Sequence, residues 1–182
     1  IAPDVARLTN VSVRTTLAAS QALVMGFSLQ GGSKPVLVRA VGPGLAAFGV
    51  TGAMADPRIT LFKDTASLES NDNWGGGATL ASAFTSVGAF PLGTGSLDAA
   101  ILRTIEGAHT VQVVGPAGAV LVEVYDAGSG SLPRLTNVSA RNRVVAGAPL
   151  IAGFAIAGPG ERRLLVRAVG PTLGTLGVTG SL

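Results

Sequence analysis

The sequence predicts an all-β protein, in which a β-sandwich module of the jelly-roll or immunoglobulin-like kind is flanked by two copies of a three-stranded β repeat. Short segments rich in Val, Leu and Thr alternate in hydrophobicity, and Gly and Pro (26 and 10 of 182 residues) punctuate them. Helical periodicity is absent except over residues 78–87, where we expect one or two turns. The third observation is an internal repeat.

The repeat relates the beginning of the chain to its end. The motif RLTNVS at residues 7–12 recurs at residues 134–139, and VRAVGP at residues 38–43 recurs at residues 166–171. The offset is 127 residues at the first motif and 128 at the second. The inserted residue falls in a Gly-rich segment, which is typical of a hairpin loop that tolerates insertions.

We name the first copy A (residues 1–55) and the second copy A′ (residues 134–182). Alternation and β-branched residues predict three strands in each copy, separated by Gly and Pro. The expected strands are residues 8–14, 23–30 and 35–41 in A, and residues 135–141, 150–157 and 164–169 in A′.

A different unit, B, occupies residues 56–126, and a Gly/Ser-rich linker at residues 127–133 follows it. Unit B begins with a strand that ends in a turn at Lys63 and Asp64, and a polar segment follows at residues 70–74 (SNDNW). Three further strands are separated by tight turns, a spacing that describes a β-sandwich. We expect these strands at residues 99–105, 109–114 and 120–125.

Unit B resembles the bacterial pre-peptidase C-terminal type of β-sandwich, through SNDNW, EGAHTVQVVG at residues 106–115 and VLVEVYD at residues 120–126. The flanking copies resemble an uncharacterised tandem β repeat of large secreted and surface proteins of environmental bacteria, in which the two kinds of unit alternate. The resemblance implies an extracellular or cell-surface location, and it brings no known catalytic residue.

The order A–B–A′ leaves the second copy without a B unit after it. Three strands are too few to hold a core, and their edges would be exposed. Three arrangements stay open: A and A′ pair within the chain, A′ packs on a neighbouring chain, or the sequence is an excerpt of a longer array. The contact residues expected for the second arrangement are Arg134, Leu135, Asn137, Val138, Leu150, Ile151, Phe154, Leu165, Arg167 and Val169.

Composition narrows the function. The chain has no Cys and one His, which leaves little material for disulfides, metal centres or acid–base catalysis. A net charge of +3 without a basic cluster argues against nucleic-acid binding, and no apolar run is long enough for a membrane span. Only 13% of the residues are charged, which favours a surface covered by partner subunits or glycans.

We therefore expect a non-enzymatic structural subunit of an extracellular filament or cell-surface array, a homo-polymer joined head to tail by strand or half-domain complementation through A′. No cofactor is expected. Arg39 and Arg167 hold the same place in the repeat among apolar neighbours, so each needs a carboxylate or carbonyl partner, within the chain or across subunits.

The alternative is a calcium- or glycan-binding accessory domain of a secreted multidomain protein. Asp64, Asn71, Asp72 and Asn73 offer the hard oxygen atoms that calcium prefers, although the same residue types also make tight turns. Trp74 could stack on a sugar. The sequons at Asn10 and Asn137 are glycan sites by pattern, and His109 is expected to be structural.

Overall fold

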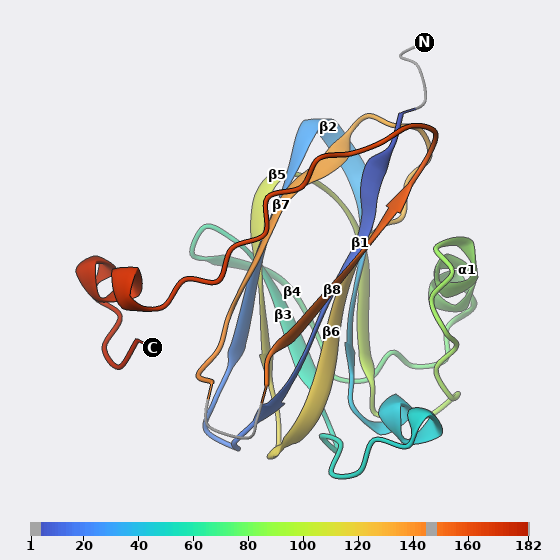
Figure 1. Ribbon diagram of the computed structural model, residues 1–182. Helices are drawn as coiled ribbons and strands as arrows, with labels where there is room; N and C mark the ends of the chain where they lie inside the picture. Colours follow the sequence, from blue (N-terminus) through green and yellow to red (C-terminus); the bar gives the residue numbers. More distant parts are fainter. Residues whose placement is uncertain (1–4, 145–148, 182) are drawn as a thin grey trace.

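The computed structural model describes residues 5–144 and 149–181, and its main chain is arranged as Figure 1 shows. The all-β class is confirmed, since 48% of the residues lie in strands and 12% in helices. The described residues form one sheet of eight strands. The elements are β1 (Arg7–Leu17), β2 (Leu23–Val41), η1 (Pro43–Phe48), β3 (Arg58–Lys63), β4 (Ala66–Asn71), α1 (Ala78–Ser86), β5 (Ala99–Val114), β6 (Gly118–Asp126), β7 (Arg134–Arg141), β8 (Ile151–Ala157) and η2 (Pro171–Leu176).

Strand β2 organises the sheet. Along one edge it pairs with β5 over almost its whole length. Along the other edge, its first half pairs with β7 and its second half with β6. The sheet then continues from β6 to β1 and β8, and from β5 to β3 and β4.

Two expected hairpin turns are irregularities inside long strands. The pairing of β2 with β5 shifts between Leu29 and Lys34, where Gly31 and Gly32 adopt φ of 99° and 118°. Gly107, with φ of 78°, lies opposite Leu29. Glycine adopts this left-handed region without strain, so both strands depart from regular geometry together and stay paired.

The two repeat copies pair reciprocally. Val11 of β1 faces Phe154 of β8, and the equivalent Val138 of β7 faces Phe27 of β2. Leu8 and Leu135, which are equivalent to each other, meet between β1 and β7. A and A′ are thus related by a pseudo-twofold axis, and the first of the three open arrangements describes β7 and β8.

Unit B is joined to A within the sheet, since β2 of A lies between β5 and β6 of B. The second half of β2 is therefore buried on both faces. Val36, Val38 and Ala40 contribute to a core with β1, β3, β5, β6 and β7. Leu37 and Val41 contribute to a second core on the other face, which α1, η1 and the loops of B cover.

The third strand expected in A′ does not form. Residues 161–170 have no strand pairing, and η2 follows them well away from the sheet at the left of Figure 1. The equivalent residues of A are held by β5 on one edge and β6 on the other. Extended backbone becomes a strand only with such partners, and no described strand flanks residues 161–170.

Candidate assembly interface

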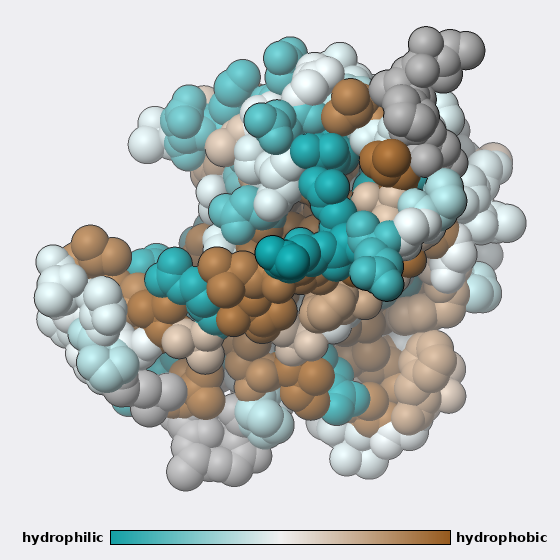
Figure 2. All heavy atoms as spheres, turned by 45° about the horizontal axis from the view of Figure 1, so that its top comes forward, coloured by the Kyte–Doolittle hydropathy of each residue, from teal (hydrophilic) through white to brown (hydrophobic). Residues whose placement is uncertain are grey.

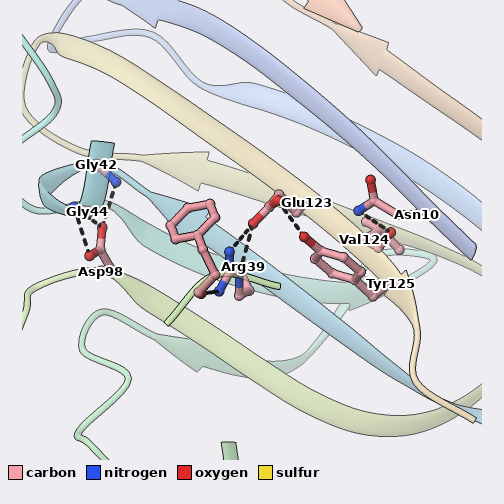
Figure 3. Close-up of polar contacts among 9 residues, drawn as sticks. Asn10, Arg39, Gly42, Gly44, Asp98, Glu123, Val124 and Tyr125 are labelled. Carbon is pink, nitrogen blue, oxygen red and sulfur yellow. Dashed lines mark hydrogen bonds and ion pairs between the residues drawn. The ribbon is translucent and has the colours of Figure 1, made fainter. Parts of the chain in front are cut away.

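The contact between A and B shows what the repeat requires of its neighbour. Arg39, on β2, is fully buried. Its Nε and Nη2 atoms donate to Oε2 of Glu123 on β6 at 2.8 and 2.5 Å, and its Nη1 atom donates to the carbonyl of Phe90 at 2.6 Å (Figure 3). A buried guanidinium is tolerated only when it is paired in this way.

Aromatic rings complete the surroundings of Arg39. Its guanidinium lies 4.4 Å from the ring centre of Phe90 and 4.9 Å from that of Phe84. The Tyr125 hydroxyl donates to the second carboxylate oxygen of Glu123 at 2.6 Å. Burial, followed by the charge of Glu123, raises the pKa of Tyr125, so its hydroxyl stays protonated as a donor.

A second carboxylate of B binds the backbone of A just beyond β2. Asp98 is fully buried, and its Oδ1 atom accepts from the Gly42 amide at 2.7 Å (Figure 3). Its Oδ2 atom accepts from the Gly44 amide at 3.0 Å. An added Cβ on Gly42 would lie 2.1 Å from the Met54 carbonyl oxygen, so the close approach requires glycine there.

A third carboxylate ends β6. Asp126 accepts from Lys34 Nζ at 2.8 Å and from Arg7 Nε at 3.2 Å. Lys34 also donates to the carbonyls of Gly130 and Pro133, so the segment expected as a linker is packed against A. Three basic residues of A are therefore paired with two carboxylates of β6.

The equivalent basic residues of A′ have no carboxylate partners within residues 5–144 and 149–181. Arg134, Arg162 and Arg167 correspond to Arg7, Lys34 and Arg39. The Nε atom of Arg134 is buried without a hydrogen-bond acceptor in the part of the chain that the structure describes. Arg162 and Arg167 are exposed, and no ion pair involves either of them among the described residues.

Apolar side chains show the same contrast. Leu37 and Val38 are at most 1% exposed, whereas the equivalent Leu165 and Val166 are 85% and 73% exposed. Phe154 is 52% exposed, against 2% for its equivalent Phe27. Figure 2 shows hydrophobic side chains on the surface of the part of the chain that follows β8 and projects at the left. Exposed apolar surface of this kind marks an interaction site.

The expected contact residues divide into two groups. The first group lies on or next to the strands of A′: Arg134, Leu135, Asn137 and Val138 on β7, Ile151 and Phe154 on β8, and Leu150 just before β8. One edge of β7 pairs with β2, and one edge of β8 pairs with β1. Along these edges β7 and β8 therefore pair within the chain and not with a neighbouring chain, while assembly through A′ stays a prediction. Leu165, Arg167 and Val169 lie on the unpaired segment.

The structure does not assemble the expected calcium site. Asp64 lies in the turn before β4 and Asp72 follows its far end, at a separation of roughly 26 Å for eight extended residues. The side chain of Asn71 bonds the Asn73 carbonyl and the Ala100 amide. The described residues contain no group of three or more His, Cys, Asp or Glu that could hold a metal ion.

Trp74 is buried, at 6% exposure, so its ring is not presented for the sugar stacking that the alternative interpretation offered. Its indole nitrogen donates to the Gly93 carbonyl, and its ring packs on Phe84. It therefore belongs to the second core. Of the two sequons, Asn10 donates to the Val124 carbonyl, while Asn137 is exposed on β7.

His109 lies on β5 opposite Phe27, with the two ring centres 6.1 Å apart. Desolvation by burial lowers its pKa below the ordinary value of 6.5, and its Nδ1 atom has no hydrogen-bond partner among the described residues. An apolar pocket of about 390 Å³ lies elsewhere, against η1, and is lined by Phe48, Phe90 and Ile151 among others. Neither feature brings reactive groups together.

Sequence reasoning missed the carboxylates Asp98, Glu123 and Asp126. The signal was present, because the basic residues of the repeat recur at equivalent positions, while eight of the ten acidic residues lie in B and none recurs between the copies. Repeated cations without repeated anions indicate a contact between units of different kinds.

No protein-family model matches this sequence, and neither the curated proteins nor the solved structures gave a significant match. No helix among the described residues is long and apolar enough to cross a membrane.

Proposed function

We propose that this chain is a non-enzymatic structural module of an extracellular filament or surface array, joined head to tail through the C-terminal segment of A′, residues 161–182. In that array a B-type unit covers the segment as B covers the end of A. One observation carries the proposal: a motif that is buried on both faces in A is exposed in A′.

The energy of such a contact favours association. Complete burial of a Leu or Val side chain contributes roughly 1.5–3 kcal/mol, and Leu164, Leu165, Val166 and Val169 are all at least 37% exposed. The unpaired backbone of residues 161–170 would gain ladder hydrogen bonds as well. These gains must exceed the entropy of ordering the segment and a partner.

The buried charged groups support a structural role. Two ion pairs join A to B: one between Arg39 and Glu123, the other between Lys34 and Asp126. The carboxylate of Asp98 accepts hydrogen bonds from the Gly42 and Gly44 amides. An extracellular location rests on the resemblance of the sequence to repeats of secreted bacterial proteins.

The partner must be a B-type unit with a vacant place for the segment. Within one chain, β2 already fills the place between β5 and β6. A second copy of this chain could therefore supply its B unit only by exchanging it, whereas an additional B-type unit would supply one without loss. The array we propose thus alternates A-type and B-type units.

The test is a chain in which Gly180, the equivalent of Gly52, is followed by a second copy of residues 53–126. Amide hydrogen exchange of residues 162–169 is measured in this extended chain and in the parent chain. We expect fast exchange in the parent and slow exchange in the extended chain, because strand pairing protects amides. A chain extended by a Gly/Ser segment of equal length is the control.

Thr172 stands where A has Gly44, so the extended chain is also prepared with Thr172→Gly. Equally fast exchange in the parent, the control and both extended chains would overturn the proposal. Sedimentation velocity over a range of concentrations identifies the source of the partner. Parent chains that associate, while a truncation after Gly160 stays monomeric, would indicate exchange between copies and a homo-polymer. The truncation ends beyond β8, so it retains every described strand.

A further inference from the structure

The proposed B-type partner has a definite chemistry, and this inference rests on the proposed function. We infer that A′ presents a second docking place, related to the first by the pseudo-twofold axis, and that it receives a strand with two carboxylates three residues apart. That strand would lie between the free edge of β7 and residues 162–169, and its carboxylates would pair with Arg134, Arg162 and Arg167.

The free edge of β7 is the first argument. In A, β1 touches β7 at Leu8 and then diverges from it, so that Asn10 to Leu17 pair with β6. In A′, β7 touches β1 at Leu135, and no strand of the described chain pairs with that edge beyond this point. The edge of β7 that corresponds to the β6-binding edge of β1 is thus vacant.

The outer edge of β8 is the second argument. Its equivalent, the first half of β2, pairs with β5 on that edge. Strand β8 pairs with β1 alone among the described strands. This edge accounts for the exposure of Phe154, whose counterpart Phe27 is covered by β5. A partner with two strands that leave a place for a third between them, as β5 and β6 do for β2, would cover β8 and residues 162–169 together.

Charge complementarity is the third argument and identifies the acidic strand. Glu123 and Asp126 are three residues apart, so they point to opposite faces of β6. Arg39 and Lys34 are five residues apart and meet one carboxylate each. Their equivalents Arg167 and Arg162 keep the same spacing, and the buried Nε of Arg134 corresponds to the Nε by which Arg7 contacts Asp126.

One of the positions that differ between the copies bears on the chemistry of the partner. Thr172 of A′ stands where A has Gly44. A Cβ on Gly44 would lie 2.9 Å from Val41 Cγ1 and 3.0 Å from Asp98 Oδ2. In the partner of A′, the carboxylate that corresponds to Asp98 must therefore lie farther from the backbone of residue 172, where the Thr172 hydroxyl can donate to it. The partner is of B type but is not identical to B.

The chain extended by residues 53–126 tests this inference, in two versions, with Thr172 retained and with Thr172→Gly. Each version carries Arg167→Met, or a Glu→Gln change at the appended copy of Glu123. We expect both changes to speed exchange of residues 162–169 by about 100-fold or more, because each leaves a buried charge or its partner unpaired. Arg163→Met is the matched control, since its equivalent in A is Pro35.

The charge reversal Arg167→Glu with Glu→Arg in the appended copy should restore much of the protection lost in either single reversal, as a double-mutant cycle would show. Protection that survives Arg167→Met as well as it survives Arg163→Met would overturn this inference and leave the proposed function standing. Fast exchange in both versions when Arg167 and the appended copy of Glu123 are unchanged would overturn the proposed function itself.

Discussion

Residues 34–49 and 162–177 are equivalent segments of the repeat, identical at 9 of 16 positions, and they have different structures. The first segment is the second half of β2 and η1, flanked by strands on both edges and buried on both faces. The second has η2 at the same place but no strand before it, and most of its side chains are exposed. The short helix is local, while the strand needs neighbours.

The two helices explain why one element survives without a partner. Both η1 and η2 begin with Pro and end at a glycine, Gly49 or Gly177, with φ of 72° and 82°. Proline presets the first turn, and a left-handed glycine ends it, through contacts within the segment. A strand makes its hydrogen bonds to other segments, so the equivalent segment of A′ forms no strand where no described strand flanks it.

The largest difference between the segments is expected at the two arginines. Arg39→Ala should lower the free energy of unfolding by about 3–5 kcal/mol, because Glu123 would remain buried without its cation. Arg167→Ala should leave the stability of the parent chain unchanged. Urea denaturation measures both, and an equal loss for both variants would show that Arg167 is buried in solution.

The leucines two residues before these arginines should show the same contrast in unfolding free energy, with a smaller difference. Leu37→Ala removes a fully buried side chain and should cost about 2–5 kcal/mol of unfolding free energy. Leu165→Ala removes an exposed one and should have no measurable cost. The midpoints of urea denaturation compare them, and destabilisation by the second substitution would contradict the exposure of this segment.

Glycine substitutions examine the approach of B to the end of β2. Gly42→Ala should cost about 1–3 kcal/mol, because its Cβ would collide with the Met54 carbonyl. Gly170→Ala is the matched control, since both glycines have negative φ. Thermal unfolding should separate the two variants by several degrees. Indistinguishable melting curves would mean that the close contact does not exist.

The smallest expected change in stability concerns His109. This residue lies opposite Phe27 on β5, whereas Phe154 pairs only with β1 among the described strands. The pKa of His109 is lower in the folded chain than in the unfolded one, so stability should fall as the pH drops below 6.5 and through the folded-state pKa. His109→Phe should reduce this dependence between pH 7 and 5. It is the only His, so an unchanged pH profile would remove it as the cause.

Local patterning made the elements of this fold predictable. Alternation and Gly/Pro punctuation placed β1, β2, β5, β6, β7 and β8 to within a few residues, and the short helix at residues 78–86 as well. The joining of two expected strands into β2, and of two into β5, was not predictable. Gly31, Gly32 and Gly107 are equally typical of turns and of bulges, and only the facing strand decides between them.

The candidate site was predictable in part. The repeat pointed to Arg39 and Arg167 and to the need for a carboxylate, but Glu123 and Asp126 come from a distant part of the sequence. The polar run at residues 71–73 suggested a cation site because calcium and tight turns select the same residue types. The hydrogen bonds of Asn71 assign it to the loop.

By itself the sequence determined the class of fold, the repeat and the chemistry that each copy presents, because these follow from residue type and spacing. The tertiary structure decided which copy has strands on both edges of its VRAVGP segment and carboxylate partners for its basic residues. It paired β1 with β8 and β2 with β7, and it inserted B beside A. The physical reason is that strand pairing and the burial of charge are set by segments far apart in the chain, which one B unit supplies to only one copy.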